Sequence, residues 1–162
     1  MQNTASPEIK ALSVVHFALF LGQLLFGFIA LFLVYSGKFF SAQLEDHLQI
    51  FVVICVITGG LSYMAGTFLF RQRLEQINSG YKLLPQKLNE YRAASITRWA
   101  LMEFAVVFNI MIFMLTSSYV VICIAGALIF MFTTFRPTTE RIANDLNIRE
   151  AELGQINKRI FF

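Results

Sequence analysis

Four long apolar stretches, residues 12–35, 50–70, 99–115 and 119–135, limit this chain to folds that a lipid bilayer can hold. Each stretch falls within or close to the range of about 17 to 25 residues that an α-helix needs to cross the hydrocarbon. Inside a bilayer the backbone polar groups must find partners within the protein, and a helix provides them along its own length. The pattern predicts an all-α fold, a four-helix transmembrane bundle.

The composition also favours a membrane environment. Hydrophobic residues make up 57% and charged residues 14% of the 162 residues, against about 25% charged residues in an average soluble domain. The net charge is +3, and the cations lie beside the apolar stretches, where anionic lipid headgroups attract them. Because no nucleic-acid-binding motif accompanies the charge, we expect the lipid bilayer as a partner and not nucleic acid.

The distribution of Lys and Arg predicts the orientation. Residues 71–98 and 136–162 hold most of these cations, whereas the first connection holds only Lys38 and the third connection holds none. Cytosolic segments of membrane proteins carry the excess of Lys and Arg. We therefore expect residues 71–98 and both the N- and C-termini on the cytosolic side.

The second and fourth stretches resemble one another. Residues 52–56 read VVICV and residues 120–124 read VVICI, and with one gap the match continues to residues 68 and 135. This internal repeat predicts two tandem helical hairpins, related by a pseudo-two-fold axis along the membrane normal. Pairs of small residues four apart would allow close helix contact within the bundle or in a homo-oligomer or larger membrane complex: Ala18 with Gly22, Cys55 with Gly59, and Cys123 with Ala127.

The segments outside the apolar stretches also show helical spacing of apolar residues. Residues 71–98 are predicted to form a cytosolic helical loop with a break near Gly80 or Pro85. Residues 136–162 are predicted to form an amphipathic tail whose helix has Pro137 in its first turn. Two interpretations of the tail stay open, a helix lying on its own loop and a helix that binds a partner or the membrane surface. Its stripe consists of Ile142, Leu146, Arg149, Leu153, Ile156 and Ile160.

A few polar residues inside the apolar stretches form a candidate intramembrane polar site. Glu103 is the acidic residue of the third stretch, and His16 lies at a matching depth in the first. The two could share a proton near the inner face, or each could instead help to fix helix packing near the headgroups. Gln23 and Asn109 lie deeper, where amides commonly form hydrogen bonds between helices, although a permeation path could use the same groups.

Signatures of enzyme chemistry are lacking in the sequence. It shows no phosphate-binding glycine loop, nucleophile elbow or metal-ligand spacing, so we predict no catalytic residues, no cofactor and no metal site. Cys55 and Cys123 lie in apolar stretches and are not expected to form a disulfide. An enzyme is the function class that the sequence supports least.

Two resemblances add to these expectations. Residues 135–141, which read FRPTTER, and the following Asp145 to Asn147 are similar to the tails of small four-span bacterial membrane proteins, which implies a bacterial inner membrane. Two hairpins with one intramembrane glutamate also resemble the duplicated proteolipid subunits of rotary ATPases in architecture. Those subunits are richer in glycine and place their carboxylate deep in the second helix of a hairpin, unlike Glu103.

Together these observations favour a non-enzymatic accessory or scaffold subunit that contacts a partner through residues 71–98 and 136–162. The alternative is a small transporter or ion-coupled subunit that uses Glu103 with His16.

Overall fold

The computed structural model describes residues 7–37 and 47–148, and this part of the chain forms five helices and no strand. The all-α prediction is therefore confirmed. Three helices, α1 to α3, are long and apolar enough to cross a membrane, and α4 is a shorter apolar helix of 15 residues. The helices are α1 (Pro7–Tyr35), α2 (Leu48–Ser79), α3 (Leu84–Thr116), α4 (Tyr119–Thr133) and α5 (Thr139–Asp145).

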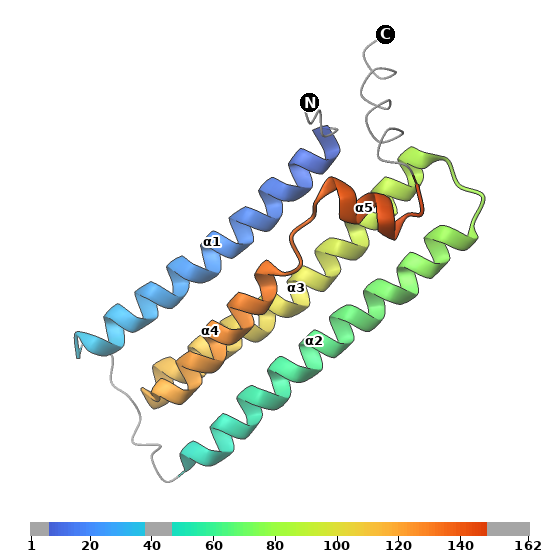
Figure 1. Ribbon diagram of the computed structural model, residues 1–162. Coiled ribbons are helices and arrows are strands. Elements are labelled where there is room, and N and C mark those ends of the chain that lie inside the picture. Colours follow the sequence, from blue (N-terminus) through green and yellow to red (C-terminus); the bar gives the residue numbers. More distant parts are fainter. Residues whose placement is uncertain (1–6, 38–46, 149–162) are drawn as a thin grey trace.

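The first four helices lie lengthwise beside one another (Figure 1). The start of α1, the connection from α2 to α3, and α5 all lie at one end of the bundle, which we call the α5 end. The tight turn from α3 to α4 lies at the opposite end. Consecutive long helices therefore run in opposite directions.

Helix α3 is the centre of the bundle. It packs against α1, α2 and α4, and it buries 44% of its most apolar stretch, compared with 17% for α1 and for α2. The outer faces of α1 and α2 expose large apolar side chains, such as Phe28 and Phe68. In water such continuous apolar faces would be unfavourable, whereas lipid tails solvate them.

The two helices of the first predicted hairpin, α1 and α2, do not pack closely against each other. In the described residues α1 and α2 pack mainly on α3 and α4, and Figure 1 shows α1 and α2 on opposite sides of that pair. In two separate hairpins, the two helices of each hairpin would pack against each other. Here the second pair of helices separates the first, and the buried face of α3 contacts both α1 and α2.

The burial pattern does not follow the sequence repeat. Cys55 is fully buried, but its counterpart Cys123 is exposed, and Leu61 is exposed where Leu128 is buried. Residues at corresponding positions of the repeat therefore differ in burial. The duplication stays a prediction from the sequence.

Glycines allow close contacts at two points of α2. A Cβ atom at Gly59 would lie 3.1 Å from the side chain of Leu128, and one at Gly66 would lie 3.4 Å from the carbonyl oxygen of Arg98. Of the three predicted pairs of small residues, only Cys55 with Gly59 lies on a buried helix face. The other two pairs face outward.

The helix boundaries follow local chemistry. Between α2 and α3 the chain breaks at residues 80–83, where the sequence predicts a break, and Pro85 stands in the first turn of α3, where its missing N–H costs nothing. Ser117 ends α3 in the left-handed conformation, with φ of 53°, and its N–H donates to the carbonyl of Phe113 at 2.7 Å. This contact closes the tight turn into α4.

Helix α5 starts later than predicted. Its N-cap is Thr138, whose hydroxyl accepts a hydrogen bond from the backbone N–H of Arg141 at 3.2 Å. Pro137 precedes this cap and is not in the first turn, because a threonine side chain can satisfy a free N–H and a proline cannot. Ile142 and Leu146, the first two residues of the predicted stripe, are buried. The rest of the stripe, from Arg149 onward, lies outside the described residues.

Candidate functional site

His16 is a buried contact between α1 and the end of α4. Its Nε2 lies 3.2 Å from the carbonyl oxygen of Phe132, so Nε2 carries the proton and donates. The imidazole stacks on the Phe132 ring at 4.6 Å and meets the Trp99 ring edge-on at 5.0 Å. These contacts fit a packing role.

Glu103 lies on α3 and is partly exposed. Among the described residues it makes neither a hydrogen bond nor an ion pair, and the partner of His16 is Phe132. The structure therefore does not join Glu103 to His16 as a proton-sharing pair.

The two amides are deeply buried. Asn109 donates from Nδ2 to the carbonyl oxygen of Ala105, one turn earlier in α3, at 2.8 Å. Its Oδ1, and both polar atoms of Gln23, have no partner within the described part of the chain. Buried amide atoms without partners are costly, and a water molecule between helices would satisfy them.

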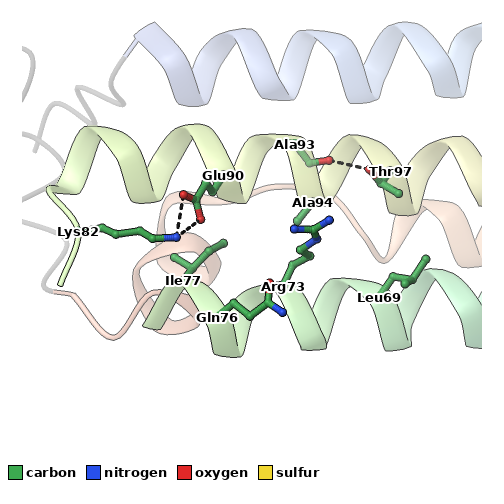
Figure 2. A pocket seen from close by; sticks show the side chains of 9 residues that line it. All are labelled: Leu69, Arg73, Gln76, Ile77, Lys82, Glu90, Ala93, Ala94 and Thr97. Atoms are coloured by element: carbon green, nitrogen blue, oxygen red, sulfur yellow. Dashed lines mark hydrogen bonds and ion pairs between the residues drawn. The ribbon is translucent and has the colours of Figure 1, made fainter. Parts of the chain in front are cut away.

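A pocket of about 530 Å³ opens between α2 and α3 at the α5 end (Figure 2). We call it the α2–α3 pocket. Apolar and small side chains form much of its wall, and Arg73 extends from α2 toward α3. The lining residues are Leu69, Arg73, Gln76 and Ile77 of α2, Lys82 of the connection, and Glu90, Ala93, Ala94 and Thr97 of α3.

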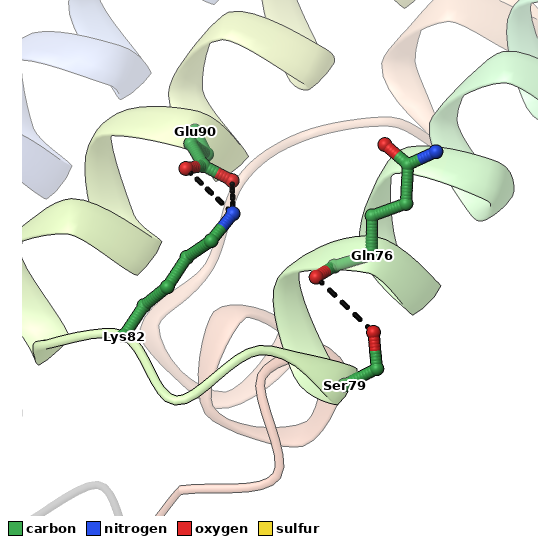
Figure 3. Close-up of polar contacts among 4 residues, drawn as sticks. All are labelled: Gln76, Ser79, Lys82 and Glu90. Atoms are coloured by element: carbon green, nitrogen blue, oxygen red, sulfur yellow. Dashed lines mark hydrogen bonds and ion pairs between the residues drawn. The ribbon is translucent and has the colours of Figure 1, made fainter.

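An ion pair stands on the side of the pocket nearest the connection (Figure 3). The Nζ of Lys82 lies 2.8 Å and 2.6 Å from the two carboxylate oxygens of Glu90. Nearby, the hydroxyl of Ser79 donates to the carbonyl oxygen of Gln76 at 3.3 Å. The pair neutralises two of the three charged groups in the wall, and Arg73 has no ion-pair partner among the described residues.

A buried arginine of α3, Arg98, was not predicted as a site residue. Arg98 is 4% exposed, and its guanidinium carbon lies 3.9 Å from the centre of the Phe70 ring and 4.4 Å from that of Phe135. The two rings replace part of the lost hydration through cation–π attraction. Arg98 is followed directly by Trp99, but the sequence could not show which rings would reach it.

Helix α5 is tied to the long helices by polar contacts. The hydroxyl of Tyr91 donates to Oδ2 of Asp145 at 2.8 Å, and Nδ2 of Asn78 donates to the carbonyl oxygen of Asp145 at 2.9 Å. Burial, followed by the negative charge of Asp145 and the hydrogen bond to it, raises the pKa of Tyr91 well above its usual range. The tyrosine therefore stays a neutral donor at physiological pH.

The described residues contain no group of three or more His, Cys, Asp or Glu side chains that could hold a metal ion. Comparisons with models of protein families, with curated proteins and with solved structures each gave no match to this chain. The function is therefore argued from the geometry of the molecule itself.

Proposed function

We propose that this protein is a non-enzymatic, multi-pass membrane protein that serves as an accessory or scaffold subunit. In this proposal α1 to α4 cross the bilayer, and the α5 end faces the cytosol. The basic residues of the loop and the tail support this orientation. A partner protein binds the connection between α2 and α3.

The observation that carries the proposal is the exposure of apolar side chains at this connection. Tyr81 is 111% exposed and Leu83 is 72% exposed. The extension of α2 from Arg71 to Ser79 rises about 14 Å, so the connection lies beyond the headgroup layer, which is about 5 to 8 Å thick. Tyrosine is enriched at protein interfaces and among the residues that contribute most to binding, and Leu83 adds apolar area beside it.

Several contacts hold the ends of α2 and α3 on either side of the connection. Helix α5 packs Ile142 and Leu146 against the ends of the long helices, and Tyr91 and Asn78 hold Asp145. The Lys82–Glu90 ion pair joins the connection to α3. Because these contacts restrain the connection before a partner binds, less conformational entropy is lost on binding.

The proposal is tested by placing a photo-crosslinking residue at Tyr81 and, as the matched control, at exposed Gln86 on the same end. Ultraviolet irradiation of native membranes should give one discrete adduct from position 81 and little from position 86. An adduct at neither position, in protein that is folded and inserted, would refute a partner at the connection.

Ion-coupled transport stays the alternative proposal. It receives less support because the contacts of His16 lead to Phe132 and not to Glu103. Proton or solute flux into liposomes that is lost in Glu103→Gln would restore it. Flux that survives this substitution would remove Glu103 from the mechanism.

A further inference from the structure

The inner part of the α2–α3 pocket lies where the headgroups of the cytosolic leaflet would be. Leu69 and Thr97 line its inner part, next to the apolar stretches that end at residue 70 and begin at residue 99. Arg73 stands three residues beyond Phe70, which is about 4.5 Å of helix rise. This height falls inside the headgroup layer, which is about 5 to 8 Å thick.

The wall of the pocket is partly apolar and partly polar. Leu69, Ile77, Ala93 and Ala94 provide an apolar surface, and Arg73, Gln76, Thr97 and the Lys82–Glu90 pair provide polar groups. A volume of about 530 Å³ is in the range of small-molecule sites. The pocket therefore fits an amphiphile better than a small soluble ion.

The charge of the pocket favours an anion. Lys82 and Glu90 neutralise each other at 2.6 Å, so the remaining charge is that of Arg73. Figure 2 shows Arg73 directed from α2 toward α3, along the pocket. Within the described residues its guanidinium has no ion-pair partner, and a guanidinium fork can bind a phosphate through two parallel hydrogen bonds.

We propose that the α2–α3 pocket binds one anionic phospholipid of the cytosolic leaflet. Arg73 holds the phosphate, Gln76 is placed to donate a further hydrogen bond, and the upper acyl chain lies on Leu69. The Lys82–Glu90 pair forms the cytosolic end of the pocket, beyond the headgroup layer. This inference depends on the proposed depth of the helices in the membrane but not on any partner protein.

The sequence offers a matched control for the key residue. Arg71 is also an exposed arginine of α2, two positions earlier, but it does not line the pocket. General attraction between basic residues and anionic lipid depends on both arginines alike. A specific site depends on Arg73 alone.

The test uses the full chain in nanodiscs of equal parts phosphatidylcholine and phosphatidylglycerol, with retained lipid measured by native mass spectrometry. The wild type and Arg71→Gln should each retain one phosphatidylglycerol. Arg73→Gln should retain about tenfold less, because a hydrogen-bonded charge is lost. Circular dichroism confirms that each variant is folded.

A second pair of variants tests the pocket and not the charge. Ala93→Phe fills the pocket from an exposed position and should also abolish retention, whereas Ile96→Phe, on the same helix outside the pocket, should not. Equal losses in Arg71→Gln and Arg73→Gln would overturn the proposal, as would equal retention of phosphatidylcholine. Full displacement of the lipid by inorganic phosphate would show that the ligand is a free phosphate and would overturn the lipid assignment.

Whether the crosslink at position 81 appears or fails does not enter this test. Loss of lipid retention with an intact crosslink separates the lipid site from the proposed partner site, and the reverse result does the same.

Discussion

At the scale of single residues, Arg98 shows how this protein tolerates a buried charge. The guanidinium is covered on the side of Phe70 and of Phe135, and the residue is 4% exposed. An uncompensated charge in such a place would cost several kcal/mol. Aromatic faces offset part of this cost, and a planar cation suits two rings better than an ammonium does.

We expect Arg98→Lys to lower the free energy of unfolding by about 1 to 3 kcal/mol, because the lysine cannot stack on both rings. The change is measured as a shift of the thermal unfolding midpoint in detergent. Arg92→Lys, at an exposed position of the same helix, is the control and should leave the midpoint within error. Equal midpoints for the two variants would contradict the role of the rings.

The hydrogen bond of Tyr91 predicts how the free energy of unfolding depends on pH. Its pKa is raised in the folded state, so the folded protein keeps this proton at pH values where the unfolded chain, with a pKa of about 10, has lost it. The stability that Tyr91 contributes is therefore complete below pH 10 and falls as the pH rises above 10.

Tyr91→Phe removes both the hydrogen bond and the titration. At pH 8 the variant should be less stable than the wild type by about 1 kcal/mol. Above pH 10 this difference should shrink, and it should vanish or reverse at higher pH. Unfolding midpoints of the two proteins from pH 8 to pH 11 check this, and a constant difference would show that the Tyr91 contact with Asp145 does not titrate.

At the scale of helices, the close contact of α2 with α3 depends on Gly66. A Cβ atom there would lie 3.2 Å from Cγ and 3.4 Å from the carbonyl oxygen of Arg98. The backbone oxygen cannot move without shifting α3. Packing of this kind is common where membrane helices approach one another at small residues.

Gly66→Ala should destabilise the protein by about 1 to 3 kcal/mol, because the added methyl group overpacks the contact. Gly60→Ala is the matched control on the same helix, with no atom within 4 Å of the new methyl group. It should be neutral or stabilise by up to about 1 kcal/mol through helix propensity. The opposite order of the two unfolding midpoints would show that α2 and α3 do not cross at Gly66.

At the scale of the whole molecule, the arrangement of helices depends on α3. The outer helices expose apolar faces, and α3 contacts α1, α2 and α4 at once. Helix α4 has only 15 residues, but Thr134 and Phe135 continue it as hydrogen-bonded turns. Helix α4 alone is shorter than the minimum of about 17 residues that a crossing needs, and this continuation brings it to that lower limit.

The proposed topology predicts which cysteines are labelled from each side of the membrane. In a background without Cys55 and Cys123, Tyr81→Cys and Asn144→Cys should react with an impermeant reagent from the cytosolic side only, and Ser36→Cys from the opposite side only. Labelling of Asn144→Cys and Ser36→Cys from the same side would show that the number of crossings between them is even and would refute the four-span topology.

The sequence alone predicted the helical fold of the described residues and the break near Gly80, and three of its four predicted spans are helices of membrane-spanning length. These features depend on local periodicity, on segment length and on proline and glycine, which act within a few residues of themselves. The burial of His16, Gln23 and Asn109 could likewise be expected, because polar side chains within a membrane-spanning helix usually face other helices and not lipid.

Only the tertiary structure decided what these residues touch. It directs His16 to Phe132, surrounds Arg98 with Phe70 and Phe135, and leaves Glu103 without a polar partner among the described residues. It also opens the first hairpin around α3 and α4 and forms the α2–α3 pocket. The apolar side chains that face lipid resemble those that face another helix. The amino-acid sequence of a stretch therefore predicts a membrane span but not which helix packs against it. The neighbours depend on side-chain shape, and shape complementarity exists only between packed helices.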